Sequence, residues 1–201
     1  MNWISFFKLF SILSLLATTA TAQEPLVKDL DTDGRADTVR IDPDRTVIVC
    51  LLSSKQFRKL ESQPIETLTE QSGIKATRNG FEFYNNFMRA GYGAQFRYQP
   101  ATQKVQLIGL SRYEFGNAAN DGSGESSVNL LTGDYIGNWN YYDFNAKDGD
   151  GALIQIPPIK TRMPFQVSNF EAFGEATYEA FATRCYRLYE HAKKRMQSKK
   201  K

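Results

Sequence analysis

The chain has 201 residues, 41% hydrophobic and 13% aromatic, with one histidine and two cysteines. This composition excludes wholesale disorder, a Ser-His-Asp triad, a His-rich or Cys₄ metal site and a disulfide-dense scaffold. The formal charge of +3 becomes −4 for residues 23–192 once Lys8 and the six basic residues of 193–201 are set aside, and this acidic body argues against nucleic-acid binding.

The first 22 residues have the pattern of a secretory signal peptide. Lys8 precedes the apolar run 9–17, and Ala20-Thr21-Ala22 offers the small-x-small site at which signal peptidase cuts. An uncleaved anchor is the alternative, but the run is much shorter than the roughly 20 residues of a spanning helix. We therefore expect cleavage after Ala22, no transmembrane segment, and a mature protein in the periplasm or outside the cell.

An acidic motif, D-x-D-x-D-G-x-x-D, occupies residues 29–37. Calcium takes about 6–8 oxygen ligands, and a tight loop can direct alternate residues at one point. Gly34 permits the sharp turn. Four side chains are expected ligands, those of Asp29, Asp31, Asp33 and Asp37. The main-chain carbonyl of Arg35 is the fifth expected ligand. A solvated acidic turn is the alternative.

The motif departs from a full EF-hand at its twelfth position. A bidentate Glu is needed there, whereas this chain has Arg40, and the neighbouring residues favour a strand over a helix. Any remaining ligands must come from elsewhere in the chain, and Asp121 and the acids of 143–150 are the candidates.

Most of the chain that follows has the pattern of short strands. β-Branched runs at 38–41 and 46–52 are separated by the turn signal Asp42-Pro43-Asp44. Residues 56–71 show weak helical spacing. Further strands are expected at 81–88, 92–98, 104–115, 125–131, 135–142 and 152–156, with 92–98 and 104–115 forming a hairpin.

Cys50 lies in an apolar run and Cys185 in a predicted helix. An oxidising compartment would allow a disulfide between them, and closing so long a loop would stabilise the fold by up to about 5 kcal/mol. The alternative is two buried free thiols that pack as small hydrophobic side chains. We expect the disulfide.

The end of the chain changes to helical spacing. Ser168 and Glu171 form a capping box, and apolar residues then recur every three or four positions. The fold class is therefore mainly β: one antiparallel, sandwich-like domain over residues 23–192, with a calcium loop near its N-terminus and an amphipathic C-terminal helix. Residues 193–201 form a basic tail.

Two other groups of side chains have alternative interpretations. Aromatic side chains at 135–144 are suited to stacking on sugars, but their alternation favours a core role for about half of them; they are Tyr135, Trp139, Tyr141, Tyr142 and Phe144. Glu114, Glu125 and Asp134 are available as a glycosidase pair, although no spacing selects them.

The segment DLDTDGRADTVRI resembles the calcium loops of FG-GAP-type bacterial secreted domains. With residues 112–143, it resembles periplasmic calcium-binding proteins related to bacterial lysozyme inhibitors, which include immunity proteins against peptidoglycan hydrolases. The resemblance covers roughly residues 27–160. It implies that an exposed loop with a Ser-Gly-x-Tyr pattern enters the cleft of the lysozyme.

The matching stretch here is Ser123-Gly124-Glu125-Ser126, in which Ser126 replaces the tyrosine. The resemblance implies a partner-binding loop made of Asn120, Asp121, Gly122, Ser123, Gly124, Glu125 and Ser126. An ordinary hairpin connection is the alternative, because loops of this composition are common on protein surfaces.

The leading hypothesis is a non-catalytic, calcium-binding periplasmic protein that inhibits a lysozyme-like peptidoglycan hydrolase, as an inhibitor or an immunity protein. The alternative is a calcium-stabilised secreted module that binds a glycan or a cell-surface polymer. A small hydrolase that uses carboxylates is a third, weaker possibility.

Overall fold

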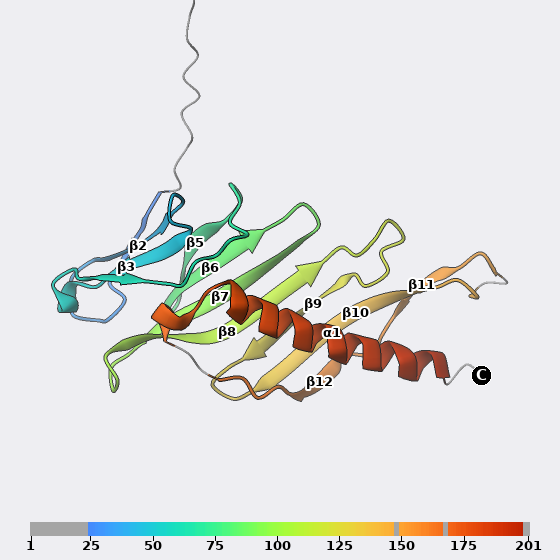
Figure 1. The fold of residues 1–201 in the computed structure, drawn as a ribbon. Helices are drawn as coiled ribbons and strands as arrows, with labels where there is room; N and C mark the ends of the chain where they lie inside the picture. Colours follow the sequence, from blue (N-terminus) through green and yellow to red (C-terminus); the bar gives the residue numbers. More distant parts are fainter. Residues whose placement is uncertain (1–23, 147–148, 167–168, 199–201) are drawn as a thin grey trace, which may run out of the picture.

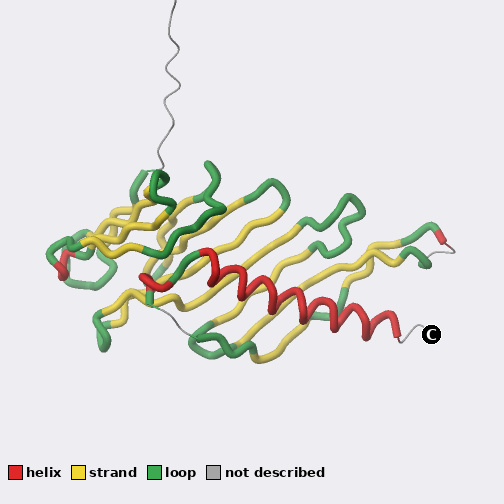
Figure 2. The backbone as a smooth tube through the Cα atoms, in the orientation of Figure 1, coloured by secondary structure: helices red, strands yellow, loops and turns green. Residues whose placement is uncertain are grey.

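The computed structural model describes residues 24–146, 149–166 and 169–198. Within these ranges, twelve strands form two antiparallel sheets, and a long helix follows the last strand (Figures 1 and 2). Sheet A contains β1 (Leu26–Lys28), β2 (Asp37–Asp42), β3 (Val47–Leu51) and β4 (Lys59–Glu61) in chain order. The expected class, mainly β and antiparallel with a C-terminal helix, is confirmed.

Sheet B is the larger sheet, and its neighbouring strands also follow chain order. Its strands are β5 (Gly73–Thr77), β6 (Gly80–Asn86), β7 (Ala90–Gln99), β8 (Lys104–Glu114), β9 (Gly124–Asn129), β10 (Asp134–Asp143) and β11 (Ala152–Gln155). The twelfth strand, β12 (Ile159–Arg162), pairs with the first half of β10, and β11 pairs with its second half. Turns of two to four residues join β2 to β3, β5 to β6, β6 to β7, β7 to β8 and β9 to β10, so these strands fold back on their predecessors.

One face of sheet B is covered by sheet A at one end and by α1 (Glu175–Ser198) along the rest (Figure 1). The main core lies between these layers and contains fully buried side chains from all three, such as Ile48, Phe96 and Phe181. A second apolar cluster joins Trp139 and Tyr141 of β10 to Tyr189 of α1. The side chains that alternate with the core residues of sheet B project to the opposite face.

One local pattern was misleading and one local prediction was wrong. Residues 56–71 form no α-helix; they contain β4 and turns, because Leu60 and Ile65 pack on the core as the chain passes sheet A. The C-terminal helix begins at Glu175 rather than after a cap at Ser168, which lies outside the described residues. Phe170 instead begins a short 3-10 turn, Phe170–Ala172, and Phe173 follows directly after it.

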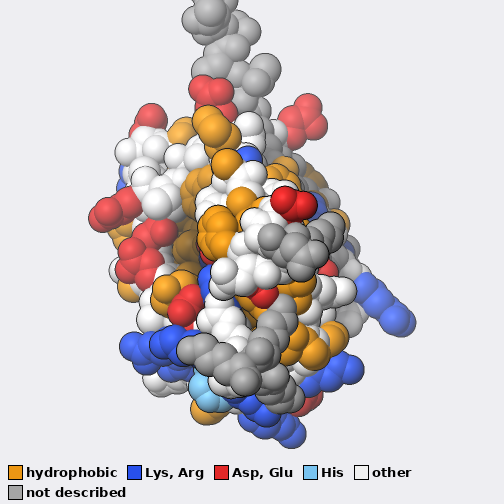
Figure 3. All heavy atoms as spheres, turned by 90° about the vertical axis from the view of Figure 1, so that its right-hand side faces the viewer, with side chains coloured by type: hydrophobic (Ala, Val, Ile, Leu, Met, Phe, Trp, Pro, Cys, Tyr) orange, Lys and Arg blue, Asp and Glu red, His pale blue; other side chains and the backbone are white. Residues whose placement is uncertain are grey.

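The helix also extends further than expected, through Ser198 and so into the predicted basic tail. Seen from the end at which α1 finishes, Lys and Arg side chains gather near the single histidine (Figure 3). The last residues of α1 therefore carry part of the positive charge of the predicted tail. Strands β1, β4, β5 and β12 were not predicted, because they are short or lack clear alternation.

The expected disulfide is absent: Cys50 and Cys185 are both buried and both unbonded. Cys50 lies on β3 of sheet A, whereas Cys185 lies on α1 with its sulfur 3.5 Å from the Ser126 hydroxyl oxygen. Burial raises the pKa of the Cys50 thiol to about 12 and also raises that of Cys185. The alternative interpretation, two buried thiols that pack as small hydrophobic groups, is the correct one.

No helix in the described ranges is long and apolar enough to cross a membrane. The predicted signal peptide, residues 1–22, lies outside the described residues.

Candidate functional site

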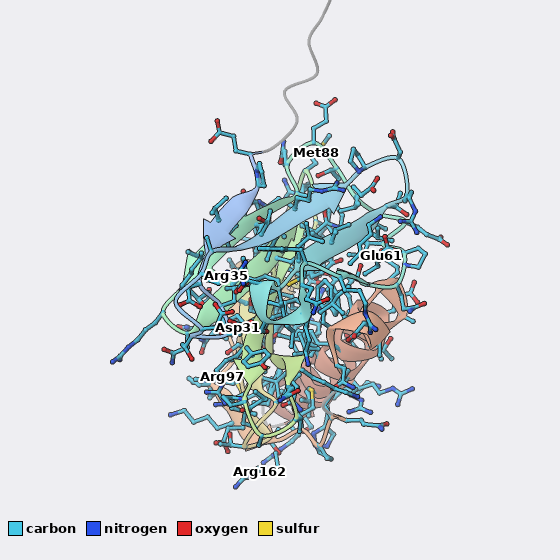
Figure 4. All side chains as sticks on the ribbon, turned by 90° about the vertical axis from the view of Figure 1, so that its left-hand side faces the viewer. Asp31, Arg35, Glu61, Met88, Arg97 and Arg162 are labelled. Atoms are coloured by element: carbon cyan, nitrogen blue, oxygen red, sulfur yellow. The ribbon has the colours of Figure 1, made fainter. Side chains whose placement is uncertain are left out.

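The acidic motif forms a tight loop between β1 and β2, at the end of the molecule seen in Figure 4. Carboxylate oxygens of Asp29, Asp31 and Asp37 all lie within 4.8 Å of one another. Gly34 has a φ of +83°, which supports the sharp turn expected of it. The spacing of the motif therefore brings three of its four aspartates to one point.

Main-chain amides hold these carboxylates in place. Asp29 accepts hydrogen bonds from the amides of Thr32 and Gly34, at 2.7 and 3.0 Å. Asp37, fully buried at the start of β2, accepts from the amides of Leu30 and Ser53, both at 2.7 Å. The loop is thus folded around its own acidic side chains.

The fourth aspartate has a different partner. Asp33 accepts a hydrogen bond from the Ser53 hydroxyl at 2.7 Å, and this bond lowers the pKa of the Asp33 carboxyl. Arg35, whose carbonyl was an expected ligand, lies next in the loop with its guanidinium over the Phe57 ring. Asp33 and Arg35 are therefore part of the loop but not of the three-carboxylate cluster.

Sequence reasoning missed the contribution of the 3-10 turn Ser53–Lys55, which follows β3. Ser53 bonds to Asp33 and Asp37, and the Ser54 hydroxyl donates to Asp31. A pair of serines directly after a buried strand was the available signal. Only the pairing of β2 with β3 places them beside the acidic loop.

Asp121, proposed as a remote ligand, lies elsewhere: it contacts Lys193 and Tyr189 of α1 and the amide of Tyr142. The expectation that it completes the acidic site is wrong, because α1 supplies its countercharge. Asp143 and Asp150 lie at the β10–β11 hairpin, and Asp150 is linked through its carbonyl to Tyr142. The remaining acid of 143–150, residue 148, is outside the described residues.

The acidic cluster has the chemistry of a site for a hard cation. Asp37 is fully buried and Asp31 is 8% exposed, yet within the described ranges no lysine or arginine forms an ion pair with any of the three carboxylates. Buried charges of like sign are costly unless a countercharge is present. Carboxylate oxygens are the type of ligand that hard divalent cations such as Ca²⁺ and Mg²⁺ take.

The predicted partner loop is only partly a loop. Gly124, Glu125 and Ser126 belong to β9, and Ser126 is 5% exposed beneath α1. Gly124 has a φ of +150°, and a Cβ there would lie 2.2 Å from the Asn138 carbonyl oxygen. The expectation that all seven residues project to solvent is therefore wrong, since β9 must begin at Gly124 to pair closely with β10.

The rest of this connection, residues 115–123, extends beyond the ends of the inner strands β8 and β9 (Figure 1) and is braced by hydrogen bonds. The Arg89 guanidinium donates to the carbonyls of Phe115, Gly116 and Asn117, at 3.0–3.2 Å. The Asn117 side chain accepts from two amides of the same loop. We call this segment the braced loop.

Its second half is fixed to the sheet and to the helix. The main chain of Asn140 pairs with Gly122 and Ser123, and the Asn140 amide also donates to the Ser123 hydroxyl oxygen at 3.1 Å. Partial burial opposes ionisation of Asp121, but the Tyr142 amide and the Lys193 ammonium outweigh it and lower the pKa of that carboxyl.

The aromatic and acidic side chains considered as sugar-binding or glycosidase residues differ in burial and in their partners. Tyr135, Trp139 and Tyr141 are buried, which confirms their core role, whereas Phe144 is 71% exposed and Tyr142 is half-buried beside it. Glu114 pairs with Arg112, and Asp134 with Arg162. Glu125 opposes Tyr113 across the β8–β9 ladder, so it projects to the face opposite that of Glu114.

Comparison with models of known protein families, with curated proteins and with solved structures gives no match to this chain.

Proposed function

We propose that this chain is a non-catalytic, calcium-binding protein of the periplasm or cell exterior that inhibits a lysozyme-like peptidoglycan hydrolase through the braced loop. The observation that carries the proposal is the fixed shape of that loop. Rigid loops bind with a smaller loss of conformational entropy than flexible ones, which is the general advantage of a preorganised inhibitor.

Exposed apolar side chains beside the loop support a protein partner. Phe115, at its base, is 53% exposed, and Met88, in the hairpin that also carries Arg89, is 93% exposed. Protein interfaces concentrate their binding energy in a few such side chains, surrounded by weaker polar contacts.

Ser123 supplies the polar contact. Its hydroxyl oxygen accepts a hydrogen bond from Asn140, and the hydroxyl proton can then be donated outward. A catalytic carboxylate in a lysozyme cleft is the acceptor that this arrangement suits, and hydrogen bonds to charged groups contribute about 1.5–3 kcal/mol.

Calcium has an indirect role in this proposal. The ion would bind Asp29, Asp31 and Asp37. It would thereby stabilise the hydrogen-bonded contact between the β1–β2 loop and the Ser53–Lys55 turn. The braced loop joins β8 to β9 and contains no residue of this acidic cluster. Calcium removal should therefore lower stability more than it changes the inhibitory surface.

The test begins by capturing secreted hydrolases with the immobilised mature chain and identifying them. Each captured enzyme is then assayed on labelled peptidoglycan with added wild-type protein or variants. Ser123→Ala and Phe115→Ala should each weaken inhibition about tenfold or more, at about 1.4 kcal/mol per decade. Thr102→Ala, in the exposed β7–β8 turn, is the matched control and should inhibit like wild type.

Gly124→Val is unsuitable as a test of the loop, because its new side chain would collide with β10. The proposal fails if no peptidoglycan hydrolase is inhibited, or if folded Ser123→Ala and Phe115→Ala proteins both inhibit as strongly as wild type.

A further inference from the structure

We propose that the face of sheet B that no other described element covers carries a groove that binds an uncharged oligosaccharide. A cavity of about 630 Å³ lies across the middle strands of the sheet, and most of its lining residues occupy strand positions that project to this face. Tyr92, Arg112 and Ser126 also belong to the lining, although their positions alternate with these. The proposed inhibitory surface uses Ser123 and Phe115, neither of which lines the cavity. The inference therefore uses other residues than the proposed function, although the rings of Tyr113 and Phe115 are in contact, with their centroids 5.5 Å apart; Tyr84, on β6, separates the two in the tests below.

The strand register explains the shape of the groove. One row of paired positions runs across five strands as Tyr84, Gly93, Ser111, Ser127 and Ile136. The adjacent row runs as Asn86, Gly91, Tyr113, Glu125 and Asn138. Four strand-to-strand steps make each row about 19 Å long, enough for an extended oligomer.

Small residues form the floor of the first row. Gly93 is buried, and a Cβ at this position would approach the Glu82 carboxylate and the Ser111 hydroxyl at 2.9 Å. Ser111 and Ser127 continue this low strip across β8 and β9. Because large side chains stand at the ends and along one side of the strip, the face is hollowed rather than flat.

Aromatic rings supply surfaces for stacking. Tyr84 stands on β6 and Tyr113 on β8, with only glycines between them on the facing positions of β7. The Tyr113 hydroxyl donates to the Asn86 side chain at 3.1 Å, and Lys75 lies over the Tyr84 ring at 5.8 Å, so both rings have fixed neighbours. Flat rings of this kind pack well on the apolar faces of pyranose sugars.

The polar lining favours a neutral ligand with many hydroxyl groups. Ser111, Ser127 and Asn138 offer uncharged donors and acceptors along the groove. Lys75 is already paired with Glu82 at 2.8 Å, and Glu125 adds an exposed negative charge. The lining also includes Arg112, which is paired with Glu114. Both cations of the lining therefore already have acidic partners, and Glu125 would repel an anionic polymer.

Other ligand classes fit less well. Ile136 is the one aliphatic side chain among the described lining residues, too little for a lipid chain. An extended peptide normally adds to a free sheet edge, whereas this groove crosses strands that are paired on both sides. A saccharide recognised by stacking and side-chain hydrogen bonds meets neither difficulty.

The experiment titrates the mature chain with chitotetraose, with cellotetraose and with an oligogalacturonate, using calorimetry. At least one neutral oligomer should bind with a Kd on the order of 0.1 mM, and the acidic oligomer should bind at least tenfold more weakly. Tyr84→Ala and Tyr113→Ala should each reduce affinity at least tenfold. Tyr113→Phe keeps the ring and should bind within about threefold of wild type.

Gly109→Ala is the matched control, since it lies on β8 outside the groove and its Cβ would meet no atom closer than 3.5 Å. Thermal unfolding reveals whether a tyrosine variant has misfolded. In that case Ser111→Leu is the second variant, because a leucine at this exposed position would obstruct the groove. Absence of binding by both neutral oligomers at 10 mM, or unchanged affinity in folded groove variants, would overturn the inference, whatever the inhibition assays show.

Discussion

At the scale of single residues, buried polar groups are the most informative feature. The two thiols are separated by the layers of the core, one on sheet A and the other on α1, so burial rather than bonding defines their chemistry. The thiolate is the reactive form, and the pKa of Cys50 is raised to about 12, far above the usual value for a free cysteine.

We expect the native protein at pH 8 to give no rapid reaction with a thiol reagent, and the denatured protein to give two thiols per chain. Cys185→Ser should leave one. Protein purified without reductant that shows no thiols after denaturation would contradict the unbonded state.

At the scale of elements, α1 is held by an apolar contact near its beginning and a polar one near its end. Phe181 is fully buried in the main core, and Lys193 pairs with Asp121 at 3.2 Å. Tyr178 lies between the start of the helix and Phe181. Its ring stacks on that of Tyr92 of β7, with the two ring centroids 3.8 Å apart. The helix therefore acts as the cover of sheet B rather than as a free tail.

Phe181→Ala should lower the free energy of unfolding by about 3–5 kcal/mol, because it leaves a cavity under the helix. Tyr186→Ala, at a position 60% exposed on the same helix, should change it by no more than about 0.5 kcal/mol. Denaturant titration measures both. Equal effects would mean that α1 does not pack on sheet B as described.

The polar contact should make stability depend on pH. A carboxyl whose folded pKa is lowered stabilises the fold above its unfolded pKa of about 3.9, and the stabilisation is lost as pH falls through the lowered folded value. Asp121→Asn should therefore cost about 1.5 kcal/mol at pH 6. The difference from wild type should vanish as the pH falls through the lowered folded pKa of Asp121.

Asp134→Asn is the comparison for this test. It removes an ion pair with Arg162 in which both side chains are more than 60% exposed, and such pairs contribute little. Its pH profile should follow wild type. A pH-independent loss for Asp121→Asn would indicate a packing role instead of a charge role.

At the scale of the whole molecule, hydrogen bonds link the acidic loop to the turn after β3, in the small sheet at one end of the core, and the proposed calcium site lies in this loop. At roughly ten times its Kd, calcium should add about 1.4 kcal/mol, a rise in Tm of about 3–5 °C. Asp31→Ala and Asp37→Asn should abolish this rise. Asp44→Asn, in the exposed β2–β3 turn, should retain it.

Scanning calorimetry with calcium, magnesium or EDTA makes the measurement. Magnesium should have a smaller effect, because it demands a stricter octahedral geometry and dehydrates reluctantly. Identical melting in calcium and EDTA would contradict a calcium site.

The sequence by itself determined the features that are written in short windows of the chain. Alternation at 92–98 and 104–115 predicted the β7–β8 hairpin, and three- and four-residue spacing predicted most of α1. Local spacing also brought Asp29, Asp31 and Asp37 together, because a tight loop needs no distant partner to converge its side chains.

Only the tertiary structure decided which distant residues meet. Ser54 reaches Asp31 through the β2–β3 pairing, and Asp121 turns to Lys193 instead of the acidic loop. The groove depends on the register of the strands, which places Tyr84 of β6, Gly93 of β7 and Tyr113 of β8 in neighbouring rows. Such contacts depend on register and layer packing accumulated over the whole chain, and a one-residue change in register reverses the face to which every side chain of a strand points.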